Sequence, residues 1–493
     1  MRLMRWFDSH RTGGLLLIYT MLAIVLAIPI LMSSVPLGVD DLNHMARIHV
    51  RAHIGGDADL ARLFELRGDL YPYLGMDLLL TPFARVLPTL LVGRIYTIGL
   101  LWGLIGATIA VQRAFTGRVG IGPAAVGLVA YNSLMAWGLI NYVLGVILAL
   151  LLFAAWHAQR ARPWPLRLVV FTVAATGLYL THLLAFVLYG VLVGSYELFG
   201  RAQPWRTPLR DWLVLAGQAV PALLLWNAVS VKMPSADLTF HYIPLAMAFA
   251  LESPFLFSGA AGGFDAGLLT GLVCGALLIV GLGRGWLVLP RSLAAPALVL
   301  LVLAIIVPFR ALGVALLDYR PPLAAACLIF AGLRLTSPRL AVPMATALAA
   351  LTIVHVADVA SLMHRCDAQY GELRDALTTL PRGAELTTVL ERSDPARGVA
   401  CTTLPIYEHI AQLVTIDRSG YAPDFFARVT SVAVRGGRAA DSDPVSADSF
   451  TATPDTNYLL WIHLGRHRAD PAGFVPLRRG SFFDLWAASA PHG

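Results

Sequence analysis

Charge is scarce in this sequence. Only 14% of its 493 residues are Asp, Glu, Lys or Arg, whereas 57% are hydrophobic, and the mean hydropathy is +0.68. A soluble globular chain has about 25% charged residues. The shortage of charge argues against an ordinary soluble protein and predicts an all-α polytopic membrane protein.

Lysine is almost absent, and the basic residues form no patch. Lys232 is the only lysine, and the net charge of +7 rests on arginines that separate the apolar runs. A chain that binds nucleic acid gathers such charge on one surface. We therefore expect no nucleic acid partner and interpret the arginines as topology signals.

Motifs for two kinds of cofactor are also missing. No Cys-x-x-Cys or Cys/His spacing predicts a zinc site, and no glycine-rich phosphate loop lies between a strand and a helix, so no nucleotide cofactor is expected. Of the four cysteines, Cys274 and Cys327 fall in apolar runs, and Cys366 and Cys401 lie in the C-terminal tail. A disulfide between the last two and a pair of free thiols both remain open.

Long apolar runs, by contrast, are plentiful. Measured against the roughly 20 residues that cross a bilayer as a helix, they predict about 11 transmembrane helices. The runs lie near 13–36, 89–111, 120–157, 167–199, 212–231, 264–283, 293–312, 320–336 and 340–361. The third and fourth runs are each predicted to form two helices, with polar breaks at 137–141 and 179–182.

Arginine flanks predict the orientation. Arg2, Arg5 and Arg11 precede the first run, and basic flanks tend to stay in the cytoplasm. A cleaved signal peptide has a similar pattern but a shorter apolar segment, so we expect an uncleaved anchor. The chain is then a multipass protein of a bacterial cytoplasmic (inner) membrane, with loop 36–88 and the C-terminal tail on the periplasmic or extracellular side.

The most informative polar stretch is Gly-Val-Asp-Asp-Leu-Asn-His-Met-Ala-Arg at 38–47, directly after the first run. On a helix, Asp40, His44, Arg47 and Arg51 would share one face. His49 and His53 would lie on the opposite face, where such a pair is more often solvated than bound to metal. Residues 71–88 suit a helix in the plane of the membrane interface.

The tail differs in character from the rest of the chain. We expect a transmembrane domain over 1–362 and a small external C-terminal α/β or α+β domain over 363–493. Helices are predicted near 367–380 and 405–414, and strands near 385–390, 458–463 and 474–477. The segment 435–454 is predicted to be a mobile loop.

Ionisable residues of the apolar region map mostly to one face of the membrane. Those expected at external ends or turns are Arg94, His182, Asp265, Arg310, Asp318, Arg320, His355 and Asp358. Glu197 is the main exception, near the inner face with Arg201 one turn away. Charged residues within membrane spans are energetically costly and usually mark a functional site. A secondary transporter would place such residues near the midplane of the membrane. This pattern favours a site at the external surface.

An acidic pair in the first external loop, about 11 spans and an external C-terminal domain together resemble the GT-C superfamily of membrane glycosyltransferases. That superfamily includes protein O-mannosyltransferases, oligosaccharyltransferases and lipid A aminoarabinose transferases. Only Asp40 and Asp41 match its motif by position. Residues 41–47, 137–142 and 179–182 also resemble a related family of bacterial multipass proteins. The GT-C resemblance implies a sugar donor linked to polyprenyl phosphate or diphosphate.

Sugar transfer of this kind would assign roles to the polar residues. Asp40, Asp41 and His44 are the candidate catalytic residues: one aspartate would take the acceptor proton, and the other would bind a divalent metal or orient His44. Asp41 is the candidate ligand for Mg²⁺ or Mn²⁺. Candidate residues for binding substrate and its phosphate are Arg310, Arg320, Asp318, His182 and Arg94.

Structural roles remain open for the same residues. Asp40 could cap the helix that follows it, Arg310 and Arg320 could extend to the interface, and Asp318 could pair with Arg320. His182 could satisfy a backbone carbonyl freed by its helix break, and His355 and Asp358 could share a local hydrogen bond.

Three functions fit these observations. The leading hypothesis is a glycosyltransferase that moves a sugar from a polyprenyl-phosphate donor to an external lipid, glycan or protein acceptor, with membrane lipids as its surroundings. A transporter or lipid flippase is the first alternative. A non-catalytic envelope-assembly subunit, which binds through its tail, is the second.

Overall fold

The computed structural model describes residues 2–36, 38–68, 70–203, 209–228, 238–240, 242–257, 266–311, 313–391, 400–427, 430–438, 440, 442–447, 449–451, 456–464 and 470–489, with the backbone alone for 2–12. Lys232 and Asp265 lie outside these ranges.

The described α-helices are α1 (Arg2–Met32), α2 (Asp41–His53), α3 (Ala58–Leu63), α4 (Leu74–Ala84), α5 (Thr89–Thr116), α6 (Ser133–Ala136), α7 (Ile140–Ala158), α8 (Trp164–Thr181), α9 (Leu183–Ser195), α10 (Leu209–Gly217), α11 (Ala219–Ala228), α12 (Pro244–Glu252), α13 (Ala266–Gly283), α14 (Arg291–Ile306), α15 (Pro321–Gly332), α16 (Ala341–Leu377) and α17 (Leu413–Arg418). Short 3₁₀ or π helices are η1 (Gly122–Leu128), η2 (Tyr196–Gly200), η4 (Pro338–Leu340), η6 (Ile406–Glu408) and η7 (Ile410–Gln412).

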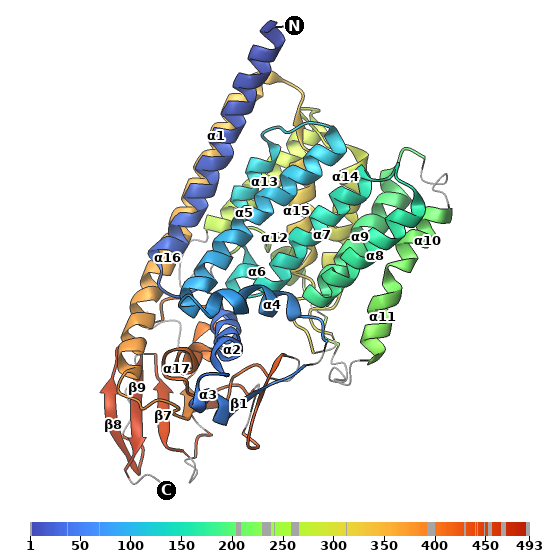
Figure 1. Cartoon of the computed structure of the whole chain (residues 1–493). Helices are drawn as coiled ribbons and strands as arrows, with labels where there is room; N and C mark the ends of the chain where they lie inside the picture. Colours follow the sequence, from blue (N-terminus) through green and yellow to red (C-terminus); the bar gives the residue numbers. More distant parts are fainter. Residues whose placement is uncertain are drawn as a thin grey trace.

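The strands are β1 (Phe64–Leu66), β2 (Leu287–Val288), β3 (Arg334–Leu335), β4 (Leu386–Leu390), β5 (Val432–Val434), β6 (Val445–Ser446), β7 (Tyr458–Ile462), β8 (Phe474–Arg479) and β9 (Phe483–Ala488). Figure 1 shows a helical bundle with the main sheet at one end, near α2 and α17, while α1 begins at the opposite end. The end that carries α2 is called the α2 end below.

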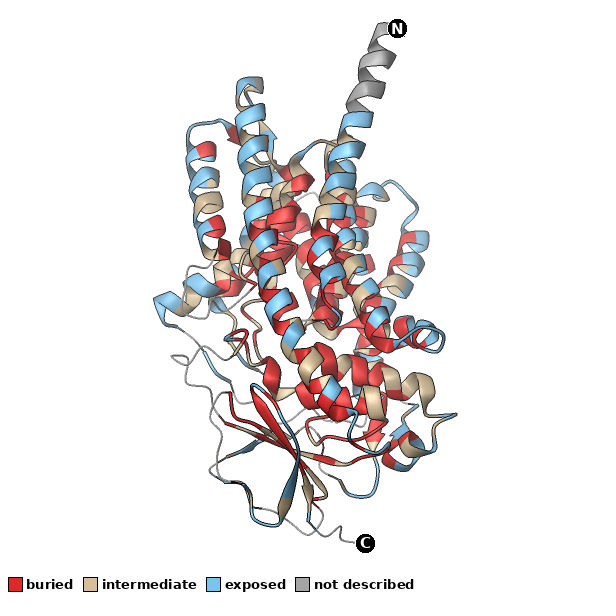
Figure 2. Ribbon diagram, turned by 90° about the vertical axis from the view of Figure 1, so that its left-hand side faces the viewer, coloured by how far each residue is buried: buried red, intermediate tan, exposed pale blue. Residues whose placement is uncertain are grey.

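Within the described residues, seven helices are long and apolar enough to cross a membrane, and α4, α14 and α15 are shorter apolar helices. Figure 2 shows buried residues inside the bundle and exposed ones along the outer faces of its helices. Many of the exposed residues are large and apolar, such as Leu16 at 69% and Ile279 at 74% exposure. Apolar outer faces are what a lipid environment requires, so the chain is a polytopic membrane protein. The predicted number of 11 spans is not confirmed.

One predicted helix is wrong. Residues 120–139 were expected to cross as the first helix of a tight pair, but they form η1, the one-turn α6 and turns between them. This segment follows α1 along its length, because the Tyr19 hydroxyl donates to the Gly120 carbonyl at 2.5 Å and the Tyr131 hydroxyl to the Leu26 carbonyl at 2.6 Å. Non-helical backbone is tolerated at membrane depth where protein surrounds it, and most of this segment is buried.

The second tight pair is confirmed. α8 ends at Thr181, α9 begins at Leu183, and His182 forms the break between them. The run predicted near 212–231 is instead divided into α10 and α11. Near the far end of the bundle, Glu197 and Arg201, which are one turn apart, form an ion pair at 2.7 Å.

The C-terminal region has the expected α+β character. Its five-stranded sheet has the order β6-β4-β7-β9-β8, with β4 parallel to both β6 and β7 and the other pairs antiparallel. The helix predicted over 405–414 is wrong, since η6 and η7 occupy most of this range and α17 begins only at Leu413. Part of 435–454 lies outside the described residues, and its mobility stays a prediction.

Two features join this region to the bundle. α16 continues without a break from Ala341 to Leu377, through the predicted domain boundary at 362, and that boundary stays a prediction. β1, from the loop after α1, pairs antiparallel with β5, so that Phe64 faces Val434 and Leu66 faces Val432. The first loop and the tail therefore share one sheet, which holds α2 between the bundle and the C-terminal region.

Candidate active site

α2 begins directly after the acidic pair. Asp40 is its N-cap residue and Asp41 its first residue, as expected for carboxylates at the positive end of a helix. The Asp40 carboxylate makes no capping hydrogen bond and is 25% exposed. The capping alternative for Asp40 is therefore wrong, and its carboxylate is available for other contacts.

The break at 137–141 fixes the start of α2. The backbone N–H of Val39 donates to Ala136 at 3.0 Å, and that of Asp40 donates to Trp137 at 3.3 Å. Gly138 has a φ of +74°, and a Cβ there would lie 2.5 Å from the Asp40 nitrogen. Only glycine suits this close approach. The stretches 38–41 and 137–141, which are far apart in the sequence, therefore meet through their backbones.

His409, from the tail, lies between two carboxylates. Its Nε2 is 3.4 Å from Asp40 Oδ1, and its Nδ1 is 3.2 Å from Asp424 Oδ2. Burial alone would lower the pKa of His409, but hydrogen bonds to Asp40 and Asp424 raise it to about 10. The ring is therefore an imidazolium at neutral pH. Asn43 holds the loop that carries Asp424, because its amide nitrogen donates to the Asp424 carbonyl at 2.6 Å and its Oδ1 accepts from the Phe426 N–H at 2.8 Å.

His44 has the opposite character. Burial and the charge of Arg47 lower its pKa to about 3, although Asp40 and a hydrogen bond to the Gly138 backbone act against this. Its Nδ1 lies 3.3 Å from Arg47 Nη1. His44 is therefore neutral across the physiological range, and it can accept or donate a hydrogen bond but carries no charge.

Asp41 is more deeply buried than Asp40. It is 3% exposed, and its Oδ1 has no hydrogen-bond partner among the described residues. Burial, followed by the charge of Asp40, raises its pKa to about 7. Its charge acts on Tyr96 in α5 and Tyr370 in α16, which places its carboxyl group on the buried side of α2.

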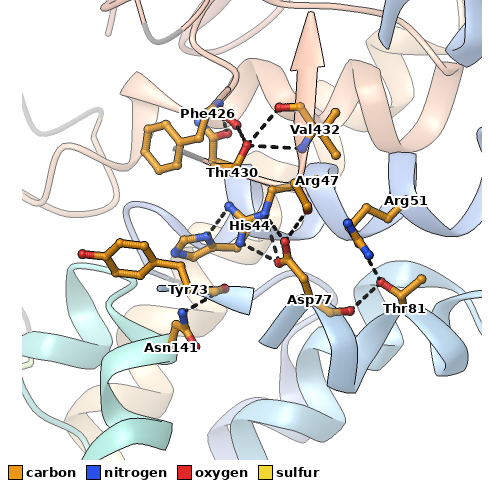
Figure 3. A network of polar contacts seen from close by, with 12 residues as sticks. His44, Arg47, Arg51, Tyr73, Asp77, Thr81, Asn141, Phe426, Thr430 and Val432 are labelled. Atoms are coloured by element: carbon orange, nitrogen blue, oxygen red, sulfur yellow. Dashed lines mark hydrogen bonds and ion pairs between the residues drawn. The ribbon is translucent and has the colours of Figure 1, made fainter. Parts of the chain in front are cut away.

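Arg47 and Asp77 form a buried ion pair beneath His44, and Figure 3 shows it at the centre of a polar network. Arg47 Nη2 is 2.8 Å from Asp77 Oδ1, and Nε is 3.0 and 3.1 Å from the two oxygens. The hydroxyls of Tyr71 and Ser431 also donate to Asp77. This network joins α2, α4 and the tail, and sequence reasoning placed Asp77 in a helix without assigning it a partner.

Arg320 lies in the same region with unused donors. It is 6% exposed, and its Nε and Nη1 have no hydrogen-bond partner among the described residues. Its Nη2 donates to the Ala315 carbonyl at 3.2 Å, and its guanidinium carbon lies 5.0 Å from the centre of the Tyr142 ring. The negative charge of Asp40 acts on this guanidinium. Buried N–H groups nearly always have partners, so this arrangement suits an anionic ligand.

His182 and Asp318 make local contacts. His182 Nδ1 accepts a hydrogen bond of 3.1 Å from the Leu184 N–H and so caps α9. The role is structural, but the partner is a backbone N–H group and not the backbone carbonyl that was predicted. Its ring packs against Tyr73 at 4.7 Å and Tyr142 at 5.1 Å, in the aromatic wall beside Arg320. Asp318 Oδ1 accepts a hydrogen bond of 3.1 Å from the Tyr319 N–H.

Two predicted phosphate-binding arginines have other surroundings. Arg310 is exposed, and its backbone pairs with Thr239. Arg94 donates to the carbonyl oxygens of Ile30 and Leu31, at 3.2 and 2.9 Å, where α1 ends. No described contact joins either side chain to Asp40, so of the three arginines proposed for phosphate binding, Arg320 is the one near Asp40.

Cys366 and Cys401 form a disulfide, with their Cα atoms 5.1 Å apart. It connects α16 to the segment that leads to His409. The Cys401 N–H donates to the Tyr407 hydroxyl at 2.9 Å, which further fixes this segment two residues before His409.

Asp41 was predicted to bind a divalent metal ion. Among the described residues, no group of three or more His, Cys, Asp or Glu side chains is arranged to hold a metal ion. Asp40 faces the His409 cation, and Asp41 is buried. The residues therefore do not fit the predicted Mg²⁺ or Mn²⁺ site, and metal dependence stays a prediction.

Sequence reasoning missed His409, Asp424 and the Arg47–Asp77 pair. His409 lies in a segment interpreted as an ordinary helix, and its only local signal is an isolated imidazole among apolar residues. Asp424 is a single carboxylate in a loop. Neither has a spacing relation to Asp40, because only the folded tail brings them to α2.

Comparison with known proteins shows the fold. No family profile matches the sequence, and no curated protein matches it. The structure is similar to the crystal structure of ArnT from Cupriavidus metallidurans in the apo state, with 13% sequence identity, a TM-score of 0.51, and coverage of 97% of this chain and 98% of that chain. ArnT is an aminoarabinose transferase of the GT-C superfamily. The chain therefore has the fold of ArnT over nearly its whole length, as the resemblance inferred from the sequence predicts.

Proposed function

We propose that this protein is a membrane glycosyltransferase that moves a sugar from a polyprenyl-phosphate-linked donor to a lipid, glycan or protein acceptor. One observation carries the proposal: the buried guanidinium of Arg320, with two unused N–H donors, lies in the field of the partly exposed carboxylate of Asp40. A base beside an anion-binding cation is what sugar transfer from a phosphate requires. The GT-C fold supports the same reaction class.

Arg320 is the proposed phosphate-binding residue. When the bond between the sugar carbon C1 and the phosphate oxygen breaks, the lipid phosphate gains negative charge. A guanidinium that is already desolvated and held against Tyr142 stabilises that charge without reorganising. Tyr73 and His182 would form the wall of the phosphate site on the side of α8 and α9.

Asp40 is the proposed general base. It would accept the proton of the acceptor hydroxyl or amine as that atom bonds to C1 and the lipid phosphate leaves. The imidazolium of His409, held by Asp424, would orient the carboxylate. Asp40 is favoured over Asp41 as the base because Asp40 is partly exposed. A general base must first lie within hydrogen-bond distance of the acceptor, and only then does its pKa affect the rate.

His44 and Asp41 are proposed as positioning residues. His44 would hold the Gly138 turn, and so the backbone of Asp40, through its hydrogen bond. Asp41, the buried first residue of α2, would help to hold the start of this helix in place. No step is assigned to a metal ion.

The test is sugar transfer by full-length protein in lipid, assayed with a radiolabelled panel of polyprenyl-phosphate sugars. Asp40→Asn should lower kcat by about 10² to 10⁴-fold, the usual range for general-base catalysis. Arg320→Gln should weaken donor binding by about tenfold or more, since it removes a charge-assisted hydrogen bond. Asp470→Asn, in an exposed ion pair with Arg479 on the sheet, is the matched control and should retain full activity.

Two results would contradict the proposal. Donor binding without turnover in the wild type would favour a flippase or an assembly subunit. Full activity of Asp40→Asn would show that Asp40 is not the base, and a parallel assay of Asp41→Asn would then test the buried neighbour.

A further inference from the structure

A second polar pocket lies on the face of α2 opposite Asp40. It has a volume of about 580 Å³ and lies between the end of α4, the start of α5 and the segment around Asp417. The basic residues that line it are His49, His53, Arg85, Arg94 and Arg374. Asp417 is the acidic residue among its lining residues, and Arg374 already binds it through hydrogen bonds of 2.7 and 2.9 Å. The pocket thus has an excess of positive charge.

The pocket lies where two membrane-spanning helices end. α5 begins with Thr89, which lines the pocket, and Arg94 contacts the last carbonyl groups of α1. Two apolar lining residues, Val86 and Leu87, are 77% and 37% exposed. Cationic and apolar groups therefore meet at the boundary between the hydrocarbon and the lipid headgroups.

The donors suit an oxyanion. The side chain of Arg85 is exposed and has no ion pair or hydrogen bond with another described residue. The first turn of α5, a helix of 28 residues, adds backbone N–H groups and a positive helix end at Thr89 and Leu90. His49 Nδ1 lies 3.0 Å from the Thr89 hydroxyl, and burial lowers the pKa of His49 to about 4, so its ring is a neutral hydrogen-bonding group.

We propose that this pocket binds the phosphate of an anionic membrane lipid, with Arg85 and Arg94 contacting the phosphate and with Val86 and Leu87 against the acyl chains. The Arg85 guanidinium can match phosphate oxygens with paired donors, whereas Arg94 would contribute its charge and its Nη1, because its Nε and Nη2 donate to α1. The site shares no lining residue with the cluster of Asp40, His409 and Arg320, so the proposal does not depend on the transfer reaction.

The test measures binding of short-chain phosphatidylglycerol to full-length protein in neutral detergent, with phosphatidylcholine and inorganic phosphate as separate titrants. Arg85→Gln should weaken phosphatidylglycerol binding by about tenfold, because a charge-assisted hydrogen bond is lost. Arg365→Gln is the control, since Arg365 is an exposed arginine of α16 outside the pocket that donates only to Ser361 among described residues. This control should bind as tightly as the wild type.

Tight binding of phosphatidylglycerol with weak binding of inorganic phosphate supports a lipid ligand. Equal binding of the two would overturn the lipid assignment and indicate a site for free phosphate. The same loss in Arg85→Gln and Arg365→Gln, or no preference for phosphatidylglycerol over phosphatidylcholine, would overturn the pocket itself.

Discussion

At the α2 end, burial has different effects on the protonation of individual residues. Asp40 and Asp41 are adjacent in sequence, but one carboxylate faces His409 and the other lies inside the bundle. A carboxylate taken from water loses solvation in its charged form, so the pKa of Asp41 rises, whereas the hydrogen-bonded His409 keeps its proton. The two adjacent carboxylates therefore have different electrostatic environments.

Asp41 should make stability depend on pH. Its pKa is raised from 3.8 to about 7 by folding, so its contribution to stability is fully present below about pH 4 and is lost as pH rises through about 7. At pH 8, Asp41→Asn should therefore unfold at a higher temperature than the wild type. The gain in the free energy of unfolding should be at most about 4 kcal/mol. Thermal unfolding in lipid at pH 4 and pH 8 checks this, with Asp470→Asn as the control. An equal difference at both pH values would contradict it.

At the scale of elements, α2 is held by contacts to three other parts of the chain. Arg47 joins it to α4 through Asp77, the Gly138 turn fixes its start, and Ala46 and Val50 pack with Phe64 and Phe425 in one apolar cluster. The interfacial character predicted for 71–88 agrees with α4, whose exposed residues include Leu78 and Phe83. The ion pair is the contact whose loss should be most costly.

Asp77→Asn should destabilise the protein by about 3 to 5 kcal/mol, because it leaves the Arg47 charge buried without a partner. Replacing both residues, as Arg47→Met with Asp77→Leu, should recover much of that loss, since no buried charge remains. Thermal unfolding of the three variants is the measurement. Asp470→Asn removes an exposed pair and should cost less than about 1 kcal/mol. If the double variant were as unstable as the single one, the prediction would be wrong. The ion pair would then stabilise the protein by more than the cost of burying its two charges.

At the scale of the whole molecule, the tail completes the candidate site. His409 and Asp424 come from the C-terminal region, the β1–β5 pairing joins that region to the first loop, and the disulfide between Cys366 and Cys401 ties it to α16. Attachment of the tail to α2 should therefore depend on the proton of His409.

His409 has a pKa raised from 6.5 to about 10 by Asp40 and Asp424. Its contribution to the attachment is fully present below about pH 6.5 and is lost as pH rises through about 10. Hydrogen exchange in α17 should therefore increase above about pH 10 beyond the intrinsic chemical rate. In His409→Gln the same region should exchange faster at pH 7 and show no further loss of protection near pH 10. Unchanged protection at pH 7 in this variant would contradict the role given to His409.

The sequence by itself determined the membrane environment of this protein, its resemblance to the GT-C superfamily and the acidic start of α2. Those conclusions rest on local quantities: apolar run length, basic flanks, and carboxylates directly after a span. Regular elements with a clear period, such as α8, α9, β4 and β7, were also predictable. The irregular crossing at 120–139 was not, because its apolar residues satisfy a helix equally well and only contacts with α1 select the other conformation.

Only the tertiary structure decided which polar residues meet. It placed Arg320 near Asp40 and left Arg310 and Arg94 elsewhere, although all three have the same local signal of an arginine at the end of an apolar run. It brought His409 to Asp40 across more than three hundred residues of sequence. Burial, pKa and pairing depend on neighbours supplied by distant segments, and helical or strand periodicity carries no information about those neighbours.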